Sequence, residues 1–144
     1  MFDLSIDDRL STWSEFRKNL DSVASPFEAV IEFWKLAPRV IHNHRIDRYN
    51  PRSWPTPWDM IVDNRYDDFS YAVIVAYTLK LSNRYKNSQI EVRSMVDSTK
   101  TRLYNLVVID DVFVLNYSDN SVVKTQDIDP TLYLENVVDI YFPR

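Results

Sequence analysis

The sequence predicts an α+β fold in which N-terminal helices and a buried central helix pack on a C-terminal antiparallel β-meander sheet. Before residue 82, apolar side chains recur every three or four positions, which is the spacing of helices. From residue 88 they recur every second position, which is the spacing of strands. Helices followed by a run of strands are typical of α+β domains.

The chain is expected to form one domain over residues 1–144, because this length and a hydrophobic content of 45% fit a single core. Residues 1–47 are expected to form its N-terminal helical part, and residues 56–144 the central helix and the sheet. Arg48–Pro57, which contains three prolines, is expected to be the connector between them.

Two helices are predicted in the N-terminal part. The first begins after Ser5, a good helix cap, and continues to about Leu20. The second begins at the run SPFE, residues 25–28, where Ser would be the cap, Pro the first helical residue, and Glu would reach back to the cap. This helix must stop before Pro38.

Two more helices follow the connector. The run TPWD at residues 56–59 repeats the start signal and predicts a short helix that ends near Asn64. The next helix begins at Asp67 or Asp68 and runs to about Leu81. Its apolar residues lie on nearly all sides, so we expect it to be buried as the central helix.

Five strands are predicted in the C-terminal half, and the last of them is expected to be a closing edge strand. They are expected at residues 90–96, 103–109, 112–117, 121–125 and 137–142. Asp110-Asp111 is expected to form a tight hairpin turn, and Asp129-Pro130 a short turn or helix. Because the chain contains no glycine, backbone positions with positive φ must fall to Asn and Asp.

Two missing residue types exclude several classes of enzyme. Without cysteine there is no disulfide, no thiolate nucleophile and no Cys-ligated zinc or iron–sulfur site. Without glycine there is no Gly-rich phosphate loop and no dinucleotide-binding fingerprint. No cofactor is expected, and no metal site, since the pair His42 and His44 lacks a third ligand.

The charge balance limits the expected partners. The formal net charge is −4 and neither half of the chain is basic, so a nucleic acid is not an expected partner. No apolar run approaches the roughly 20 residues of a membrane span. The acidic start MFDLSIDDRL is unlike a signal peptide, so we expect synthesis in the cytoplasm and no membrane partner.

A buried helix with a short polar segment before it, NRYDDFSYAVIVAYTLKL, is followed by three antiparallel strands, QIEVRSMVD, TRLYNLVVID and DVFVLNYS. This order of elements, over about residues 56–121, resembles the core of the transglutaminase-like proteins, which have a papain-like fold. In that family a Cys opens the central helix, a His opens the second strand, and an Asp lies late in the third.

The triad of that family is missing here. The Cys position falls at Asp67 or Asp68, the His position near Arg102, and the Asp position at Asn116. Without a thiolate and an imidazole, acyl transfer of that type cannot occur. The resemblance therefore implies a transglutaminase-like scaffold without its chemistry, a pseudoenzyme.

The run NPRSWPTPWDMIVDNRYDDFSYAVIVAYTLKLS also resembles segments of small proteins of tailed bacteriophages. This resemblance implies a tail, baseplate or capsid-associated component that is made in the host cytoplasm and incorporated into a virion. It leaves open a second role, that of a phage-encoded inhibitor of a host protein.

The candidate partner-binding residues lie in residues 39–58, which contain the one dense basic cluster of the chain. Arginine and aromatic residues dominate binding hot spots. We therefore expect contacts with a protein partner from Arg39, Arg45, Arg48, Tyr49, Arg52 and Trp54. The alternative is that the arginines pair with acidic residues elsewhere in the chain. For Trp54, surface and core are both open, whereas Trp58 is expected in the core.

An alternative function is that of a hydrolase or nuclease that uses Mg²⁺ and the carboxylates of Asp63, Asp67 and Asp68. It requires these three carboxylates to converge. Their positions at helix ends favour capping instead. The sequence therefore predicts a non-enzymatic structural or interaction protein that assembles with protein partners.

Overall fold

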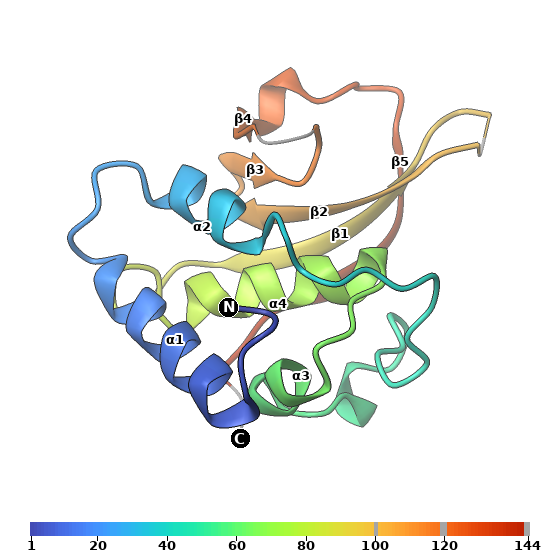
Figure 1. Cartoon of the computed structure of the whole chain (residues 1–144). Coiled ribbons are helices and arrows are strands. Elements are labelled where there is room, and N and C mark those ends of the chain that lie inside the picture. The colour runs from blue at the N-terminus through green and yellow to red at the C-terminus, as the bar shows by residue number, and fades with distance from the viewer. Residues whose placement is uncertain (100, 119–120, 143–144) are drawn as a thin grey trace.

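Helices come first in the chain and strands follow, so the predicted α+β class is confirmed (Figure 1). The computed structural model describes residues 1–99, 101–118 and 121–142. In these residues the helices are α1 (Ile6–Asn19), α2 (Pro26–Trp34), α3 (Pro57–Asp63) and α4 (Asp68–Lys80), with the short 3₁₀ helices η1 (Pro51–Ser53) and η2 (Thr125–Asp127). The strands are β1 (Ile90–Val96), β2 (Leu103–Ile109), β3 (Phe113–Leu115), β4 (Val123–Lys124) and β5 (Tyr133–Asp139).

Side-chain caps start three of the four α-helices, as predicted. Ser5 caps α1, and capping boxes start α3 at Thr56 and α4 at Asp67. The start of α2 differs from the prediction, because the side chain of Ser25 makes no capping hydrogen bond. The backbone of Ser25 has ψ near 78°, outside the extended conformation that Ser5 and Thr56 adopt at their caps. Pro26 is the first residue of α2, as predicted.

The sheet has the order β4-β3-β2-β1-β5, and its neighbouring strands are antiparallel. The first four strands form a meander, and β5 returns to pair with the free edge of β1. β1 and β2 match their predicted ranges, whereas β3 and β4 are shorter and β5 begins and ends earlier. β3 ends at Leu115 because Asn116 has a φ of 69°, which breaks the extended backbone.

Asn and Asp occupy the positions with positive φ, as the absence of glycine requires. The four in the described residues are Asn64, Asp110, Asp111 and Asn116. Asp110 and Asp111 form the turn between β2 and β3. The carboxylate of Asp110 also accepts a hydrogen bond from the backbone N–H of Gln89, at 2.8 Å, which ties this turn to the start of β1.

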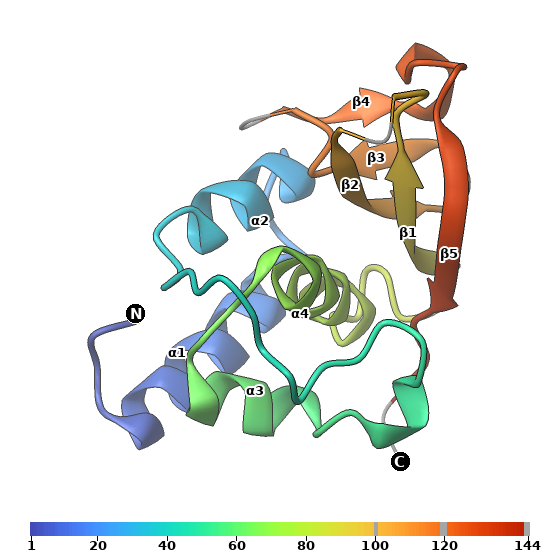
Figure 2. The same ribbon diagram turned by 90° about the vertical axis from the view of Figure 1, so that its right-hand side faces the viewer.

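The central position of α4 explains its apolar sequence. Viewed along its axis, α4 lies between the sheet on one side and α1, α2 and α3 on the others (Figure 2). Residues on all its sides, Val73, Ile74 and Leu79 among them, are buried in one core with Ile90 and Val92 of the sheet. Among the described residues no helix, α4 included, is long and apolar enough to cross a membrane.

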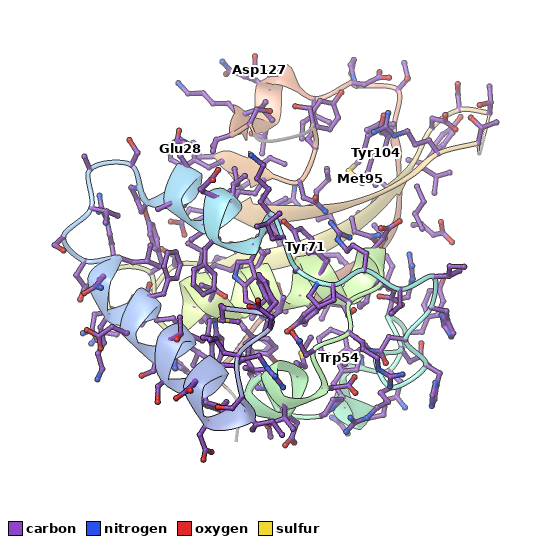
Figure 3. All side chains as sticks on the ribbon, viewed as in Figure 1. Glu28, Trp54, Tyr71, Met95, Tyr104 and Asp127 are labelled. Carbon is purple, nitrogen blue, oxygen red and sulfur yellow. The ribbon has the colours of Figure 1, made fainter. Side chains whose placement is uncertain are left out.

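The opposite face of the sheet carries a second, smaller cluster. Leu106 and Val108 of β2 are buried there, and Met95 and Tyr104 pack against them. Figure 3 shows Met95 and Tyr104 beside the sheet, on the side away from α4. The ring of Tyr104 stacks on that of Tyr117, with the centroids 5.4 Å apart.

The hydroxyl of Thr78 joins three helices. It accepts hydrogen bonds from the indole N–H of Trp13 in α1, at 3.0 Å, and of Trp34 in α2, at 3.1 Å. It donates to the carbonyl of Ile74, one turn earlier in α4, at 2.8 Å. One donor and two acceptor sites are all that a hydroxyl offers, so the group is saturated. Thr78 and both tryptophans are fully buried.

Replacing Thr78 by Val should destabilise the fold by about 2–4 kcal/mol, because two buried indole N–H groups lose their acceptor. The matched variant Thr78→Ser keeps the hydroxyl, loses only a methyl group and should cost about 1 kcal/mol. Urea denaturation of both variants measures the difference. A Thr78→Val variant as stable as Thr78→Ser, or more stable, would show that the two hydrogen bonds to this hydroxyl do not make the larger contribution.

Candidate functional site

The segment of residues 39–58 leaves α2 and crosses in front of α4 (Figure 1). Its first residues pair with the chain just before α4. The N–H of Val40 donates to the carbonyl of Tyr66, at 2.9 Å, and the N–H of Tyr66 donates to the carbonyl of Pro38, at 3.1 Å. The segment is therefore fixed at its start to the chain just before α4, and at its end it continues into α3, which begins at Pro57.

Asn43 anchors the middle of this segment and is buried. Its backbone N–H donates to the carboxylate of Asp67, at 2.9 Å, and its side-chain amide donates to the carbonyl of Arg65, at 3.0 Å. The other oxygen of the Asp67 carboxylate accepts the N–H of Ser70, at 2.8 Å, as the cap of α4. One carboxylate thus fixes both the central helix and the segment in front of it.

Arg48 and Trp54, two predicted contact residues, are half-buried and bound within the chain. The guanidinium of Arg48 donates to the hydroxyl of Ser94, at 3.3 Å, and its carbonyl accepts from the side-chain amide of Asn136, at 2.9 Å. The indole N–H of Trp54 donates to the carbonyl of Asp47, at 2.6 Å. Of the two interpretations left open for Trp54, internal packing fits this geometry.

The other four predicted contact residues are exposed, and three of them also contact another side chain of the chain. Arg39 stacks on the ring of Tyr71 and pairs with Asp68, at 3.2 Å. Arg45 lies 3.8 Å from a carboxylate oxygen of Asp63. Tyr49 and Arg52 are also exposed. The hydroxyl of Tyr49 donates to Glu135, at 3.2 Å, and Arg52 lies in η1.

Two exposed apolar residues were not expected from the sequence. Ile41 is fully exposed and Leu36 is 81% exposed. Leu36 follows the end of α2 and does not continue the spacing of the buried Val30 and Trp34. This spacing in the sequence could have indicated that Leu36 faces solvent. Arg39 forms a bridge with Tyr66, and the half-buried Val40 lies between the exposed Arg39 and Ile41.

The prediction that Trp58 lies in the core is wrong, because this side chain is 41% exposed. It occupies the first turn of α3 and meets Trp13 of α1 edge to face, with the ring centroids 6.4 Å apart. Met60 and Ile61 supply the buried face of α3 instead.

The three triad positions of the transglutaminase resemblance do not come together. Asp67 caps α4, as described above. Arg102 precedes β2 and its guanidinium lies over the ring of Tyr104, 4.5 Å from the centroid, on the sheet face away from α4. Asn116 donates from its side-chain amide to the carbonyl of Asn105, at 2.8 Å. Each residue therefore has a structural partner of its own.

The carboxylates of the alternative Mg²⁺ site are each engaged by arginines or N–H groups of the chain. Asp63 is next to Arg65 and Arg45, Asp67 binds two backbone N–H groups, and Asp68 pairs with Arg39. In the part of the chain that the structure describes, no group of three acidic or histidine side chains is arranged to hold a metal ion. The convergence that this alternative requires is not present.

Comparisons of the chain with protein-family models, with curated proteins and with solved structures find no match. The resemblances to transglutaminase-like proteins and to phage proteins therefore stay predictions from the sequence.

Arg48 and Arg52 should respond differently to truncation. Arg48→Ala removes a hydrogen bond to Ser94 and the packing of its stem, so it should lower stability by roughly 1–3 kcal/mol. Arg52→Ala, at an exposed position, should change stability by less than about 0.5 kcal/mol. Thermal unfolding of the two variants, which lose the same charge, tests this assignment. An Arg48→Ala variant as stable as Arg52→Ala would contradict it.

Proposed function

We propose that this chain is a non-enzymatic interaction protein that binds a protein partner through the exposed leucine, isoleucine, tyrosine and arginine side chains of residues 36–52. We call these side chains the docking surface. Its members are Leu36, Arg39, Ile41, Arg45, Tyr49 and Arg52.

The observation that carries this proposal is the full exposure of Ile41 in a segment whose backbone is fixed on both sides. Val40 is held by Tyr66, and Asn43 is held by Asp67. Covering an exposed apolar side chain with a partner lowers the free energy of the complex. Little conformational entropy is lost on binding, because the backbone is already ordered. Leu36 and Tyr49 add exposed apolar area to the same segment.

The charge of the docking surface indicates the chemistry of the partner. Arg39, Arg45 and Arg52 are exposed there, although the chain as a whole has a net charge of −4. The pairs that Arg39 and Arg45 make with Asp68 and Asp63 involve partly exposed groups, and such pairs contribute little to stability. Arg45 can exchange Asp63 for a carboxylate of another protein, and Arg39 can bind one with the N–H groups that its pair with Asp68 leaves free. We therefore propose a partner with an acidic contact surface around an apolar centre.

The non-enzymatic role in this proposal is supported by the absence of cysteine and by the structural contacts of the triad positions. The chain has no cysteine, so the thiolate of a transglutaminase-like reaction is missing. Asp67, Arg102 and Asn116 are each occupied by a structural contact. The larger assembly that we favour is a virion of a tailed bacteriophage. An inhibitor of a host protein would use the same docking surface but would dissociate from its target.

The test compares two triple variants that each lose one exposed isoleucine and two exposed positive charges. Ile41→Ser, Arg45→Ser and Arg52→Ser alter the docking surface, whereas Ile6→Ser, Lys18→Ser and Lys86→Ser make matched changes at exposed positions elsewhere. Both variants should keep the thermal midpoint of the wild type, because all six side chains are exposed. A partner isolated on the wild-type chain should bind the control normally and the docking variant at least about 100-fold more weakly, which is roughly 3 kcal/mol.

Calorimetric titration with the isolated partner gives both affinities. If the two triple variants bind equally well, or if only the control loses binding, the docking surface lies elsewhere. Turnover of a peptide or glutamine substrate that is lost on replacing Asp67, Asp68 or Asn116 would overturn the non-enzymatic role.

A further inference from the structure

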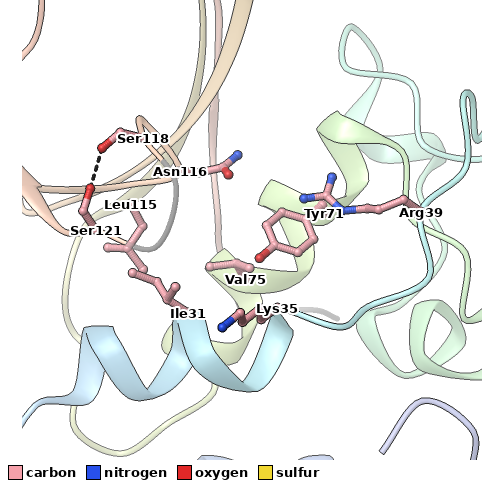
Figure 4. Close-up of a pocket in the computed structure, with 9 residues that line it drawn as sticks. All are labelled: Ile31, Lys35, Arg39, Tyr71, Val75, Leu115, Asn116, Ser118 and Ser121. Carbon is pink, nitrogen blue, oxygen red and sulfur yellow. Dashed lines mark hydrogen bonds between the residues drawn. The ribbon is translucent and has the colours of Figure 1, made fainter.

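A small pocket lies beside the docking surface, between α2, α4 and the end of β3 (Figure 4). Its volume is about 200 Å³. This is below the roughly 300 Å³ at which sites for drug-sized ligands begin, but above the ~150 Å³ of a protein cavity that holds benzene. The pocket therefore has room for a group as large as one amino-acid side chain.

The wall of the pocket divides into an apolar and a polar part. Ile31 of α2, Val75 of α4 and Leu115 of β3 supply the apolar part. The polar part combines two cations with neutral hydroxyl and amide groups. It consists of Lys35, Arg39, Tyr71, Asn116, Ser118 and Ser121. A ligand that matches this wall has a short apolar stem and an anionic head.

Arg39 is held in place for such a head. Its guanidinium carbon lies 3.6 Å from the centre of the Tyr71 ring, and a nitrogen lies 3.2 Å from the carboxylate of Asp68. Its backbone forms a bridge with that of Tyr66. A cation that is fixed before the ligand arrives loses less entropy on binding than a mobile one. The guanidinium also has donors left for a second carboxylate, because it carries five N–H groups.

Tyr71 and Lys35 complete the polar side. Burial raises the pKa of Tyr71, against the opposite effect of the nearby Arg39, so the phenol keeps its proton at neutral pH and can donate. Lys35 follows the last residue of α2 and makes only a long, exposed pair with Glu32, at 3.9 Å. Its ammonium group is therefore available to a ligand at low cost.

We infer that this pocket binds a small aliphatic carboxylate, with the carboxylate between Lys35 and Arg39 and the stem against Ile31, Val75 and Leu115. The same group occurs in a free short-chain acid and in a glutamate side chain of a partner protein. The pocket shares only Arg39 with the docking surface, so its ligand can be tested without a partner.

The probes are butyrate, which has the stem and head of a glutamate side chain, and butyramide, its neutral isostere. Butyrate should shift the NMR signals of the Asn116 side-chain amide in a saturable way, and butyramide should not. Lys35→Gln should raise the dissociation constant of butyrate about fivefold, because an exposed but directed charge is lost. Lys18→Gln, the same change on the exposed side of α1, should leave it within a factor of about two.

A second pair of probes separates the two sources of the carboxylate. These are the tripeptides Ala-Glu-Ala and Ala-Gln-Ala with both ends blocked. Binding of Ala-Glu-Ala as tight as that of butyrate would assign the pocket to a partner's side chain, and binding of butyrate alone would assign it to a free acid. Equal shifts with butyrate and butyramide, or an equal loss of affinity in Lys35→Gln and Lys18→Gln, would overturn the inference.

Discussion

The hydroxyl group of Thr78 lies where α1, α2 and α4 meet, and two tryptophans from different helices donate to it. These bonds fix the rotation of α1 and α2 about the central helix, which apolar packing alone would leave less well defined. The rotation of α2 places Ile31 and Lys35 at the pocket, and it determines where the following segment leaves the helix. Both the pocket and the docking surface therefore depend on this buried polar contact.

The opposite end of α4 uses a carboxylate in the same way. The two oxygens of Asp67 are engaged with the N–H groups of Ser70 and Asn43. The start of a helix, where N–H groups lack partners, can stabilise either a reactive anion or a structural one. Here the structural use connects the central helix to the segment of residues 39–58.

Short-range signals in the sequence predicted most of the fold, whereas the site depends on long-range contacts. The capping boxes at Thr56 and Asp67 span four residues each, so they are visible in the sequence. The inward orientation of Arg48 depends on Ser94 and Asn136, which are 46 and 88 residues away. No local pattern contains that information. Arg48 and Arg52 lie in the same basic segment, but only the long-range contact of Arg48 with Ser94 distinguishes its role from that of the exposed Arg52.

The position of β5 has a consequence for folding during synthesis. This strand is the last one in the described residues but pairs with β1, the first strand of the sheet, and Val138 and Ile140 complete the main core. Translation at ~5–20 residues per second leaves roughly 2–8 s between the emergence of β1 and that of β5. During this time one edge of β1 has no partner, and an open edge pairs readily with other chains. Rapid synthesis in many copies, as for a component of a particle, would therefore favour association of incomplete chains at this edge.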